Sequence, residues 1–330
     1  MSDNQTRVIV GTAVAVGTLT VAGLAYLYNS KKAEESIPTK WKKVGKIIDL
    51  NCFPVKSCAP IKCDSFDCHL LGIEYESLFD RCFVISQGKK QTTARAYPKM
   101  VLIQPTVVDN ELHLSAPDMP DFVLNLDELR TGSINGKVEC WYSKVKGIDA
   151  GDDIANWLSE FIVGKPGKLR LLYYPYAYPT KGVSKNDREW KAYRGDDAGT
   201  YHDKTSYMLI NQASIDELNA HLDHVVKPLQ FRPNLVIKGP GAYDEDNWKW
   251  IKVGESVVYR VLKPCTRCIF TNINPETGVR HPKREPLETL VKNRSIIPNQ
   301  TPVMGTQIGI RVTGRISVGD DVYINDESEA

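Results

Sequence analysis

The sequence predicts a mainly β fold with some α-helix, arranged as two β-rich domains behind an N-terminal membrane anchor. Three observations support this prediction. An uncharged apolar run lies within the first 30 residues, short apolar or alternating runs cut by Gly, Pro, Asn and Asp dominate from Trp41 onward, and only two stretches show helical periodicity. A chain of 330 residues also exceeds one average domain, which favours two.

Residues 8–28, VIVGTAVAVGTLTVAGLAYLY, carry no charge, and about 20 apolar residues suffice to span a bilayer. A cleaved secretory signal is the alternative, because small residues follow the apolar stretch. Lys31 and Lys32 directly after the run favour a retained anchor, and positive charge on that side places the body on the cytosolic side. We therefore predict an anchor over 1–30, spanning 8–28, and a linker and domain entry over 31–50.

The first folded domain is predicted over 51–165, as a β-barrel-like unit of short strands. At its end, GDDIANWLSEFIVGK predicts an amphipathic helix that begins behind acidic residues and ends at Gly164. The apolar residues at helical spacing are Ile154, Trp157, Leu158, Phe161 and Ile162.

The second domain is predicted over 166–330. It begins with a strand and a basic, aromatic loop over 177–206, and loops of this length tend to be functional or disordered. A helix is expected to begin at Ser214, with Glu217 in the capping-box position. Further strands follow, and 307–324 is predicted to be a closing hairpin.

Charge and cysteine content exclude some classes of protein. The net charge of +2 is too small for a duplex-binding protein, so we expect no nucleic-acid partner. The eight cysteines could form disulfides, but a domain of this size does not need them. Cysteines that need not form disulfides agree with a body that faces the cytosol.

The stretch VLKPCTRCIFTNINPETG, residues 261–278, contains a Cys-x-x-Cys motif. Zinc would need a second ligand pair, and no other cysteines in the chain form one. A disulfide exchanger would need a helix after the second cysteine, whereas IFTNINPETG predicts a strand and a hairpin. Two packed strand cysteines are the plain alternative. That alternative leaves Arg267 unexplained, because a guanidinium suits phosphate or a planar heterocycle.

Several motifs in chain order resemble one family. FRPNLVIKG (231–239), AYDEDNW (242–248), KPCTRCIFTNINPETG (263–278) and REPLETL (284–290) resemble the MOSC domain of the amidoxime-reducing molybdenum enzymes. PVKSC (54–58), FDRCFVI (79–85) and TARAYPKMVLI (93–103) resemble the N-terminal β-barrel domain of the same family. The resemblance covers nearly the whole chain, including the single anchor.

The resemblance implies a molybdenum cofactor, a pterin whose dithiolene sulfurs and one protein thiolate hold the metal. The ligand position falls on Cys268, and a thiolate is the soft donor that such a metal accepts. Cys265 is then a structural neighbour. The implied cofactor-binding residues are Lys56, Ser57, Arg81, Thr205, Ser206, Arg232, Asn234, Thr266, Arg267 and Cys268. Relatives carry a cofactor-contacting tyrosine where this chain has Gln307, which puts that contact in doubt.

The resemblance also implies the activity, which is reduction of amidoximes, hydroxamic acids and N-hydroxyguanidines to amidines or amines. Electrons would come from NADH through cytochrome b5 reductase and cytochrome b5, so the chain needs no dinucleotide-binding motif of its own. It also implies the outer mitochondrial membrane. Two other readings stay open: a MOSC module that handles molybdenum cofactor or sulfur, and a membrane scaffold without chemistry.

Cytochrome b5 is acidic around its haem edge, so a basic docking surface is expected by charge complementarity. The basic residues of the loop are our candidates: Lys181, Lys185, Arg188, Lys191 and Arg194. His202 and Asp203 adjoin the implied Thr205 contact, and they are candidate proton donors.

Overall fold

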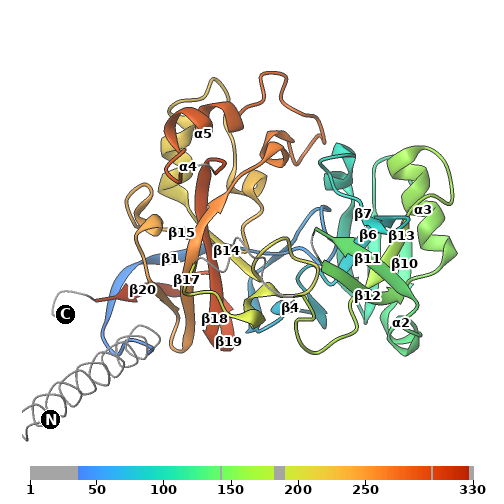
Figure 1. The fold of residues 1–330 in the computed structure, drawn as a ribbon, viewed down its shortest axis with the longest axis horizontal. Helices are drawn as coiled ribbons and strands as arrows, with labels where there is room; N and C mark the ends of the chain where they lie inside the picture. The colour runs from blue at the N-terminus through green and yellow to red at the C-terminus, as the bar shows by residue number, and fades with distance from the viewer. Residues whose placement is uncertain (1–35, 142, 182–189, 299, 327–330) are drawn as a thin grey trace, which may run out of the picture. The chain divides into compact units, whose positions relative to one another are not determined.

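The structure is a computed structural model that describes residues 36–141, 143–181, 190–298 and 300–326 (Figure 1). The predicted anchor, Lys185 and Arg188 lie outside these residues. No helix in the described part is long and apolar enough to cross a membrane. From Lys40 onward the chain forms one compact unit. This unit is mainly β with some helix, which confirms the predicted class.

The largest sheet of the unit closes on itself. Its strand order is β15-β14-β18-β17-β16-β20-β1-β2, and β1 also pairs with β15. The strands are β1 (Trp41–Cys52), β2 (Ile61–Cys63), β14 (Tyr207–Asn211), β15 (Leu235–Lys238), β16 (Trp250–Val253), β17 (Val257–Thr266), β18 (Val303–Val312) and β20 (Asp321–Asn325). Figure 1 shows β1, from the start of the described chain, beside β20, from its end.

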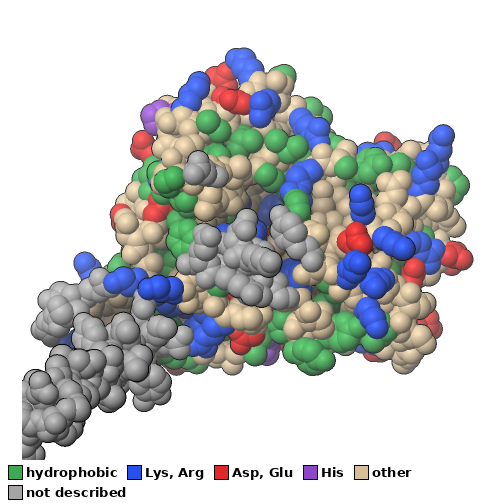
Figure 2. Space-filling model, in the orientation of Figure 1, with side chains coloured by type: hydrophobic (Ala, Val, Ile, Leu, Met, Phe, Trp, Pro, Cys, Tyr) green, Lys and Arg blue, Asp and Glu red, His purple; other side chains and the backbone are tan. Residues whose placement is uncertain are grey.

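A smaller closed barrel has the order β11-β12-β13-β6-β7. Its strands are β6 (Phe83–Gln87), β7 (Lys90–Gln91), β11 (Gly136–Cys140), β12 (Ser143–Asp149) and β13 (Arg170–Tyr173). On the hairpin β11–β12, exposed Lys137, Lys144 and Lys146 alternate with buried Val138 and Val145, as expected for strands with one buried face. Figure 2 shows Lys and Arg side chains over these strands.

Two open sheets and several helices complete the unit. The sheets are β8 (Gln104–Val108), β9 (Glu111–Ser115) and β10 (Phe122–Asn125), and β3 (Ser65–His69), β4 (Gly72–Tyr75), β5 (Leu78–Phe79) and β19 (Gly314–Ser317). The α-helices are α2 (Leu126–Thr131), α3 (Asp152–Val163), α4 (Gln212–Asn219) and α5 (Leu287–Asn293). The 3₁₀ helices are η1 (Pro98–Leu102), η3 (Gly195–Ala198), η4 (Pro228–Phe231), η5 (Asp244–Asp246) and η6 (Ile269–Asn272).

The barrels do not follow the order of the chain. β1 begins within the predicted linker, yet it lies between β15 and β20 of the large barrel. β13 follows the predicted boundary at 165/166, yet it pairs with β6 and β12 of the smaller barrel. The division into 51–165 and 166–330 stays a prediction, and strands on both sides of it contribute to these barrels.

The predicted helix α3 is confirmed at both ends. It runs from Asp152 to Val163, and Gly164 ends it with a left-handed φ of 69°, the conformation that glycine adopts most easily. All five apolar residues predicted to face the core are buried.

The predicted start of the next helix is wrong. α4 begins two residues earlier, where the side chain of Asn211 caps Ala213 N at 3.2 Å. Ser214 is inside the helix, and its hydroxyl donates to the buried carboxylate of Glu245 at 2.8 Å. The Ser214 hydroxyl, which the sequence assigned to the helix cap, therefore bonds to Glu245, a residue distant in the chain.

The predicted closing hairpin over 307–324 is also wrong, because β19 lies between β18 and β20 in the chain but pairs with β3 of another sheet. The strand predicted after Cys268 is instead the single turn η6. Ile273 and Arg280 then form a bridge across the turn that contains Pro275 and Gly278.

Candidate functional site

A cavity of about 860 Å³ opens between the two barrels. The segment that follows β1 joins the large barrel to the smaller one. Val55 forms a parallel bridge with Phe83 of β6, and Lys56 N donates to Phe83 O at 2.9 Å. Nine of the ten predicted cofactor-binding residues line the cavity: Lys56, Ser57, Arg81, Thr205, Arg232, Asn234, Thr266, Arg267 and Cys268. The tenth, Ser206, is buried behind it and donates to Asp197 O through both its N (2.9 Å) and its Oγ (3.3 Å).

The two cysteines of the Cys-x-x-Cys motif differ, as predicted. All eight cysteines lie in the described residues, all are free thiols, and Cys268 is the exposed one while the other seven are buried. Cys268 precedes η6, and its carbonyl accepts from Thr271 N at 3.1 Å. Cys265 packs inside the protein, where Gln307 Nε2 lies 3.7 Å from its sulfur. Both cysteines line the cavity, but only the thiol of Cys268 is exposed there, while Cys265 is buried.

Left-handed backbone is concentrated around this cavity. Four lining residues that are not glycine have positive φ: Ser57 at 72°, Arg81 at 52°, Trp141 at 57° and Arg232 at 56°. Such conformations cost on the order of 1–3 kcal/mol each, and they persist where surrounding structure enforces them, commonly at binding sites.

Arg81 and Arg232 form a pair of cations beside Phe53. Their guanidinium carbons lie 4.5 and 4.2 Å from the centre of the Phe53 ring. Arg232 Nη1 donates to Cys58 O at 2.7 Å, but its buried Nη2 has no hydrogen-bond partner. Burial, and then the nearby charge of Arg81, lower the pKa of Arg232 to about 9. An anion at Nη2 would satisfy this donor and raise the pKa of Arg232 again.

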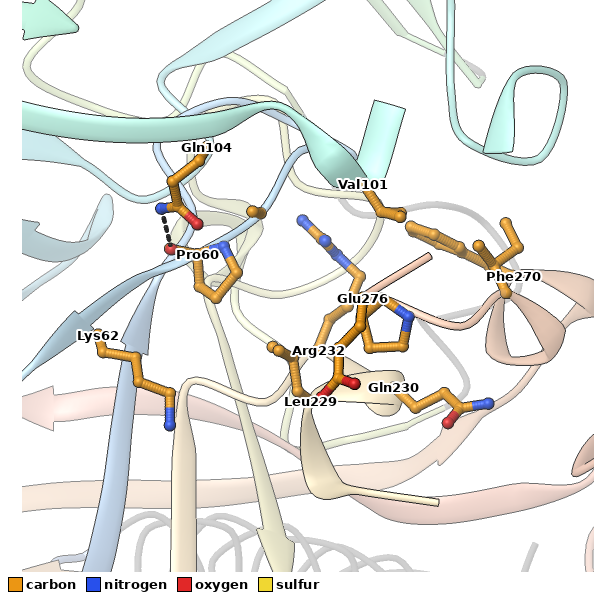
Figure 3. A pocket seen from close by; sticks show the side chains of 12 residues that line it. Pro60, Lys62, Val101, Gln104, Leu229, Gln230, Arg232, Phe270 and Glu276 are labelled. Atoms are coloured by element: carbon orange, nitrogen blue, oxygen red, sulfur yellow. Dashed lines mark hydrogen bonds between the residues drawn. The ribbon is translucent and has the colours of Figure 1, made fainter. Parts of the chain in front are cut away.

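Arg232 also lines a second cavity of about 380 Å³, which shares Gln230 and Phe270 with the larger one. Figure 3 shows its side chain reaching among the residues of this second cavity. There Gln104 Nε2 donates to Pro60 O at 2.8 Å. The arginine therefore separates two adjoining spaces.

A buried network behind the cavity centres on Asp80, which sequence reasoning missed. Its carboxylate accepts from Phe53 N at 2.6 Å and Asn234 Nδ2 at 3.1 Å, and it pairs with Arg81. Asn234 Oδ1 in turn accepts from Met208 N at 3.1 Å. The side chain of Asn234, a predicted cofactor contact, is thus used to join strands of the large barrel.

His202 belongs to the same network. Its Nε2 lies 2.9 Å from Asp80 Oδ2, and its Nδ1 accepts from Thr200 N at 3.1 Å. Burial lowers the pKa of His202 to about 4, although Asp80 opposes the shift. A neutral imidazole with both nitrogens used inside the protein has no proton for a substrate, so His202 does not fit the role of proton donor.

Asp203 is the carboxylate at the cavity wall, and it lies among cations. It pairs with the buried Lys56, accepts from Trp141 Nε1 at 2.7 Å, and lies 3.6 Å from Arg95 Nη2. Burial raises the pKa of Asp203, but Lys56 and then the Trp141 bond outweigh it and hold the pKa well below its usual range. Asp203 is therefore ionised at neutral pH, which also does not fit a proton donor.

Lys181 does not fit the predicted docking surface. It is buried, lines the cavity, and donates from Nζ to the carbonyl of His202. Burial and then Lys56 lower its pKa to about 7. Of the other predicted docking residues that are described, Lys191 and Arg194 are exposed.

Arg267 was expected to meet phosphate through its guanidinium, and the structure uses that group differently. Nε and Nη2 donate to Met304 O at 2.9 and 2.6 Å, and Nη1 donates to Phe231 O at 2.9 Å. Its backbone N donates to Pro302 O at 2.7 Å. These bonds hold the Thr266–Cys268 backbone against β18 and η4, so Arg267 positions the exposed thiol.

Gln307, at the position where the resemblance implies a tyrosine, lines the cavity. A tyrosine arrives from elsewhere in the chain, because Tyr193 also lines the cavity and its hydroxyl donates to Gln307 Oε1 at 2.6 Å. Arg95 lies in the motif 93–103 and Tyr193 in the loop 177–206, but the sequence assigned neither residue a role at the cavity. Trp141 lies in no stretch that the sequence analysis singled out.

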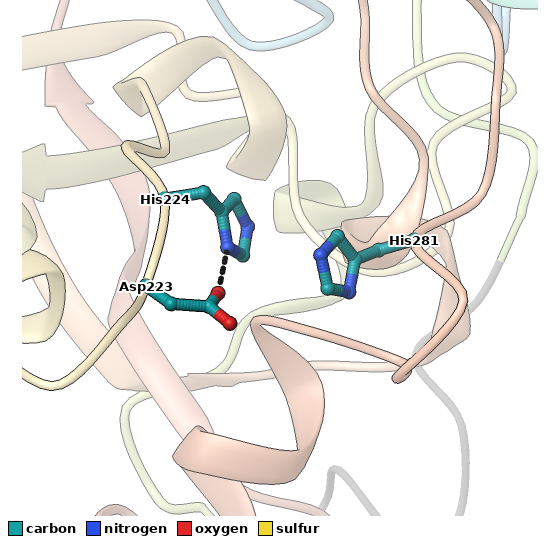
Figure 4. A group of neighbouring side chains, drawn as sticks. All are labelled: Asp223, His224 and His281. Carbon is teal, nitrogen blue, oxygen red and sulfur yellow. Dashed lines mark hydrogen bonds and ion pairs between the residues drawn. The ribbon is translucent and has the colours of Figure 1, made fainter.

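A separate cluster of Asp223, His224 and His281 lies outside this cavity (Figure 4). His224 Nδ1 is 2.9 Å from Asp223, and Lys283 Nζ is 3.1 Å from the same carboxylate. The two imidazoles stack with centres 4.3 Å apart and planes 12° apart. The lone pairs of an imidazole lie in its ring plane, so stacked rings do not converge on one ion. The arrangement is that of a surface ion-pair cluster.

Comparisons with known proteins agree with this architecture. A family described as the MOSC N-terminal beta barrel domain matches residues 44–165, and one described as the MOSC domain matches residues 196–323. These matches define the class as a MOSC-domain protein. A Mus musculus protein named mitochondrial amidoxime-reducing component 1 is 33% identical over 94% of this chain and 89% of its own length. Its Homo sapiens namesake is 32% identical, over 86% and 84%.

A Bos taurus protein named mitochondrial amidoxime reducing component 2 is 29% identical over 89% of this chain and 87% of its own length. The chain belongs to the family of the mitochondrial amidoxime-reducing components, which confirms the resemblance seen in its motifs.

Proposed function

We propose that this chain is a molybdenum-cofactor reductase that converts amidoximes, hydroxamic acids and N-hydroxyguanidines to amidines or amines. The observation that carries the proposal is Cys268, the exposed thiol of the chain, in the wall of a cavity rich in cations. The names of the relatives, which state amidoxime reduction, support it.

The donor set of the cavity fits such a cofactor. Its described lining contains seven basic side chains, namely Lys56, Arg81, Arg95, Lys181, Lys204, Arg232 and Arg267, against one carboxylate, Asp203. A pterin dithiolene with a phosphate is strongly anionic and would offset this excess. The buried Nη2 of Arg232 has no hydrogen-bond partner, and an oxygen of the cofactor could accept its hydrogen bond.

Each residue then has a distinct task. Cys268 Sγ would be the metal ligand, and the bonds of Arg267 to backbone carbonyls would hold that thiol in place. Arg81 and Arg232 would bind the anionic part of the cofactor, and Thr205 and Thr266 would contribute hydroxyl contacts. When bound, the cofactor supplies a redox centre that passes two electrons to the substrate.

The overall reaction breaks the N–O bond of the substrate. Two electrons and two protons convert R–C(NH₂)=NOH to the amidine, and the hydroxyl oxygen leaves as water.

We propose that the electrons come from NADH through cytochrome b5 reductase and cytochrome b5. Exposed Lys191 and Arg194 are the described part of the proposed docking loop. The proposed location is the outer mitochondrial membrane, with the body facing the cytosol, and the word mitochondrial in the relatives' names supports the organelle.

The test is reduction of benzamidoxime by the purified chain, reconstituted with NADH, cytochrome b5 reductase and cytochrome b5. Cys268→Ala should lose molybdenum and activity together, because the metal loses its protein ligand. Cys265→Ala is the matched control, since its sulfur is packed against Gln307, and it should retain molybdenum. Lys191→Glu should raise the KM for cytochrome b5 at unchanged molybdenum content.

Full activity of Cys268→Ala would contradict the ligand assignment. Stoichiometric molybdenum without amidoxime reduction would instead favour the alternative, a MOSC module that binds or handles the cofactor or sulfur. Protein without molybdenum, pterin or activity would favour a scaffold.

A further inference from the structure

Trp141 occupies a backbone position that its residue type disfavours. Cys140 and Ser143 pair across the hairpin β11–β12, so the loop holds two residues and Trp141 is the first. The turns favoured in hairpin loops of this length have a positive φ at the first position, where glycine, asparagine or aspartate is preferred. Trp141 has a φ of 57°. A large aromatic residue here is a strained exception, and such exceptions point to a binding role.

The indole of Trp141 is held in one orientation. Its Nε1 donates to Asp203 Oδ1 at 2.7 Å, and the guanidinium carbon of Arg95 lies 4.3 Å from its ring centre. Asp203 is itself fixed by Lys56. Because these contacts already restrict the side chain, a ligand that binds there does not have to order it.

The same indole is accessible to a ligand. Trp141 is 49% exposed, although it makes both of these contacts. It lines the cavity that contains Cys268. An anchored, half-exposed indole in the wall of a reaction cavity is suited to stack on a flat molecule.

We propose that Trp141, oriented by Asp203 and Arg95, is a stacking subsite for the planar aromatic part of an N-hydroxylated substrate. This inference rests on the proposed function. Aromatic rings gain an offset-stacking interaction with an indole that alkyl groups lack. The carboxylate of Asp203 beside the ring would accept a hydrogen bond from the amino group of an amidoxime. The subsite would therefore favour aryl over alkyl amidoximes.

Binding to the full-length, molybdenum-loaded protein tests the subsite without turnover. Titration calorimetry, with no electron donor present, compares benzamidoxime with acetamidoxime. Trp141→Asn suits the left-handed turn but removes the ring, and Trp141→Phe keeps an aromatic face. Trp41→Phe, at the start of β1 and outside the cavity lining, is the control. Circular dichroism and molybdenum content verify that each variant is folded and loaded.

Trp141→Asn should raise the Kd for benzamidoxime about threefold to tenfold, the range that an aromatic pair contributes, and leave that for acetamidoxime unchanged. Trp141→Phe should retain most of the preference. Equal effects on both ligands, or no effect on either, would overturn the subsite. Loss of molybdenum in the Trp141 variants would also overturn it, because the ring would then belong to the cofactor. Ring-dependent binding without reduction by the parent protein would uphold the subsite and refute the proposed function.

Discussion

At the scale of single residues, the site separates side chains that meet the cavity from side chains that hold it. Cys268 presents an exposed thiol to the cavity, and Arg232, which also lines it, has a buried Nη2 without a hydrogen-bond partner. Arg267 and Asn234 line the same space, but their side chains donate hydrogen bonds to other protein groups. A motif predicts which residues lie at a site, but only their hydrogen bonds show which role each one has.

His202 should make the protein sensitive to acid. Its pKa is about 4 when folded, against an ordinary value of 6.5, so between these values the unfolded chain binds a proton that the folded protein does not. Stability should therefore fall as the pH falls from 6.5 to 4, by up to about 1.4 kcal/mol per pH unit. Urea unfolding at pH 7 and pH 5 measures this.

His202→Gln is the matched variant, because its amide can still donate to Asp80. It should show a shallower fall in stability between pH 7 and pH 5. The lowered pKa of Asp80 affects stability only at still lower pH, so it does not obscure this comparison. Identical pH dependence in the two proteins would show that His202 is not the responsible group.

At the scale of elements, a buried ion pair connects η3 to β18. Arg311 Nη1 donates to Asp197 Oδ1 at 2.7 Å, Nη2 donates to Oδ2 at 3.1 Å, and both side chains are at most 3% exposed. Asp197 O also accepts the two bonds from Ser206. Ser206, expected to bind the cofactor, instead helps this pair to hold the segment that leads to Thr205.

Arg311→Met should destabilise the protein by about 3–5 kcal/mol, because it leaves the Asp197 carboxylate buried without its partner. Chemical denaturation measures the loss. Adding Asp197→Leu should recover much of it, since no unpaired charge then remains. Arg315→Met, which breaks an exposed pair with Asp67, should change stability little. A small loss in Arg311→Met would mean that water reaches Asp197.

At the scale of the whole molecule, the large barrel depends on a strand from the start of the described chain. β1 pairs with β15, β20 and β2, and Val55, just after β1, forms a bridge with Phe83 of the smaller barrel. Linear boundaries cannot predict this arrangement, because the pairing of β1 with β20 joins residues more than 270 positions apart, such as Lys43 and Tyr323.

Deletion of residues 1–35 should leave the unit folded, with an unchanged thermal unfolding midpoint, because β1 remains complete. Deletion of residues 1–53 should prevent folding, since β15 and β20 lose the strand between them and expose unpaired edges. Thermal unfolding and size-exclusion chromatography compare the two. A cooperative transition in the shorter chain would show that the barrel closes without β1.

The anchor predicted over 8–28 leads to a separate expectation, that deletion of residues 1–35 releases the protein from membranes.

The sequence by itself determined the β-rich class, helix α3 with its Gly164 terminus, the family, and the asymmetry between Cys265 and Cys268. These features depend on local periodicity, on turn chemistry and on motifs whose residues are close in the chain. Only the tertiary structure decided that β1 belongs to the large barrel, that Lys181 is buried, and that Arg267 and Ser206 bind backbone carbonyls. It also placed Trp141 and Tyr193 at the cavity. The physical reason is that a polar side chain bonds to whichever partner folding brings within reach, and that partner is usually distant in sequence.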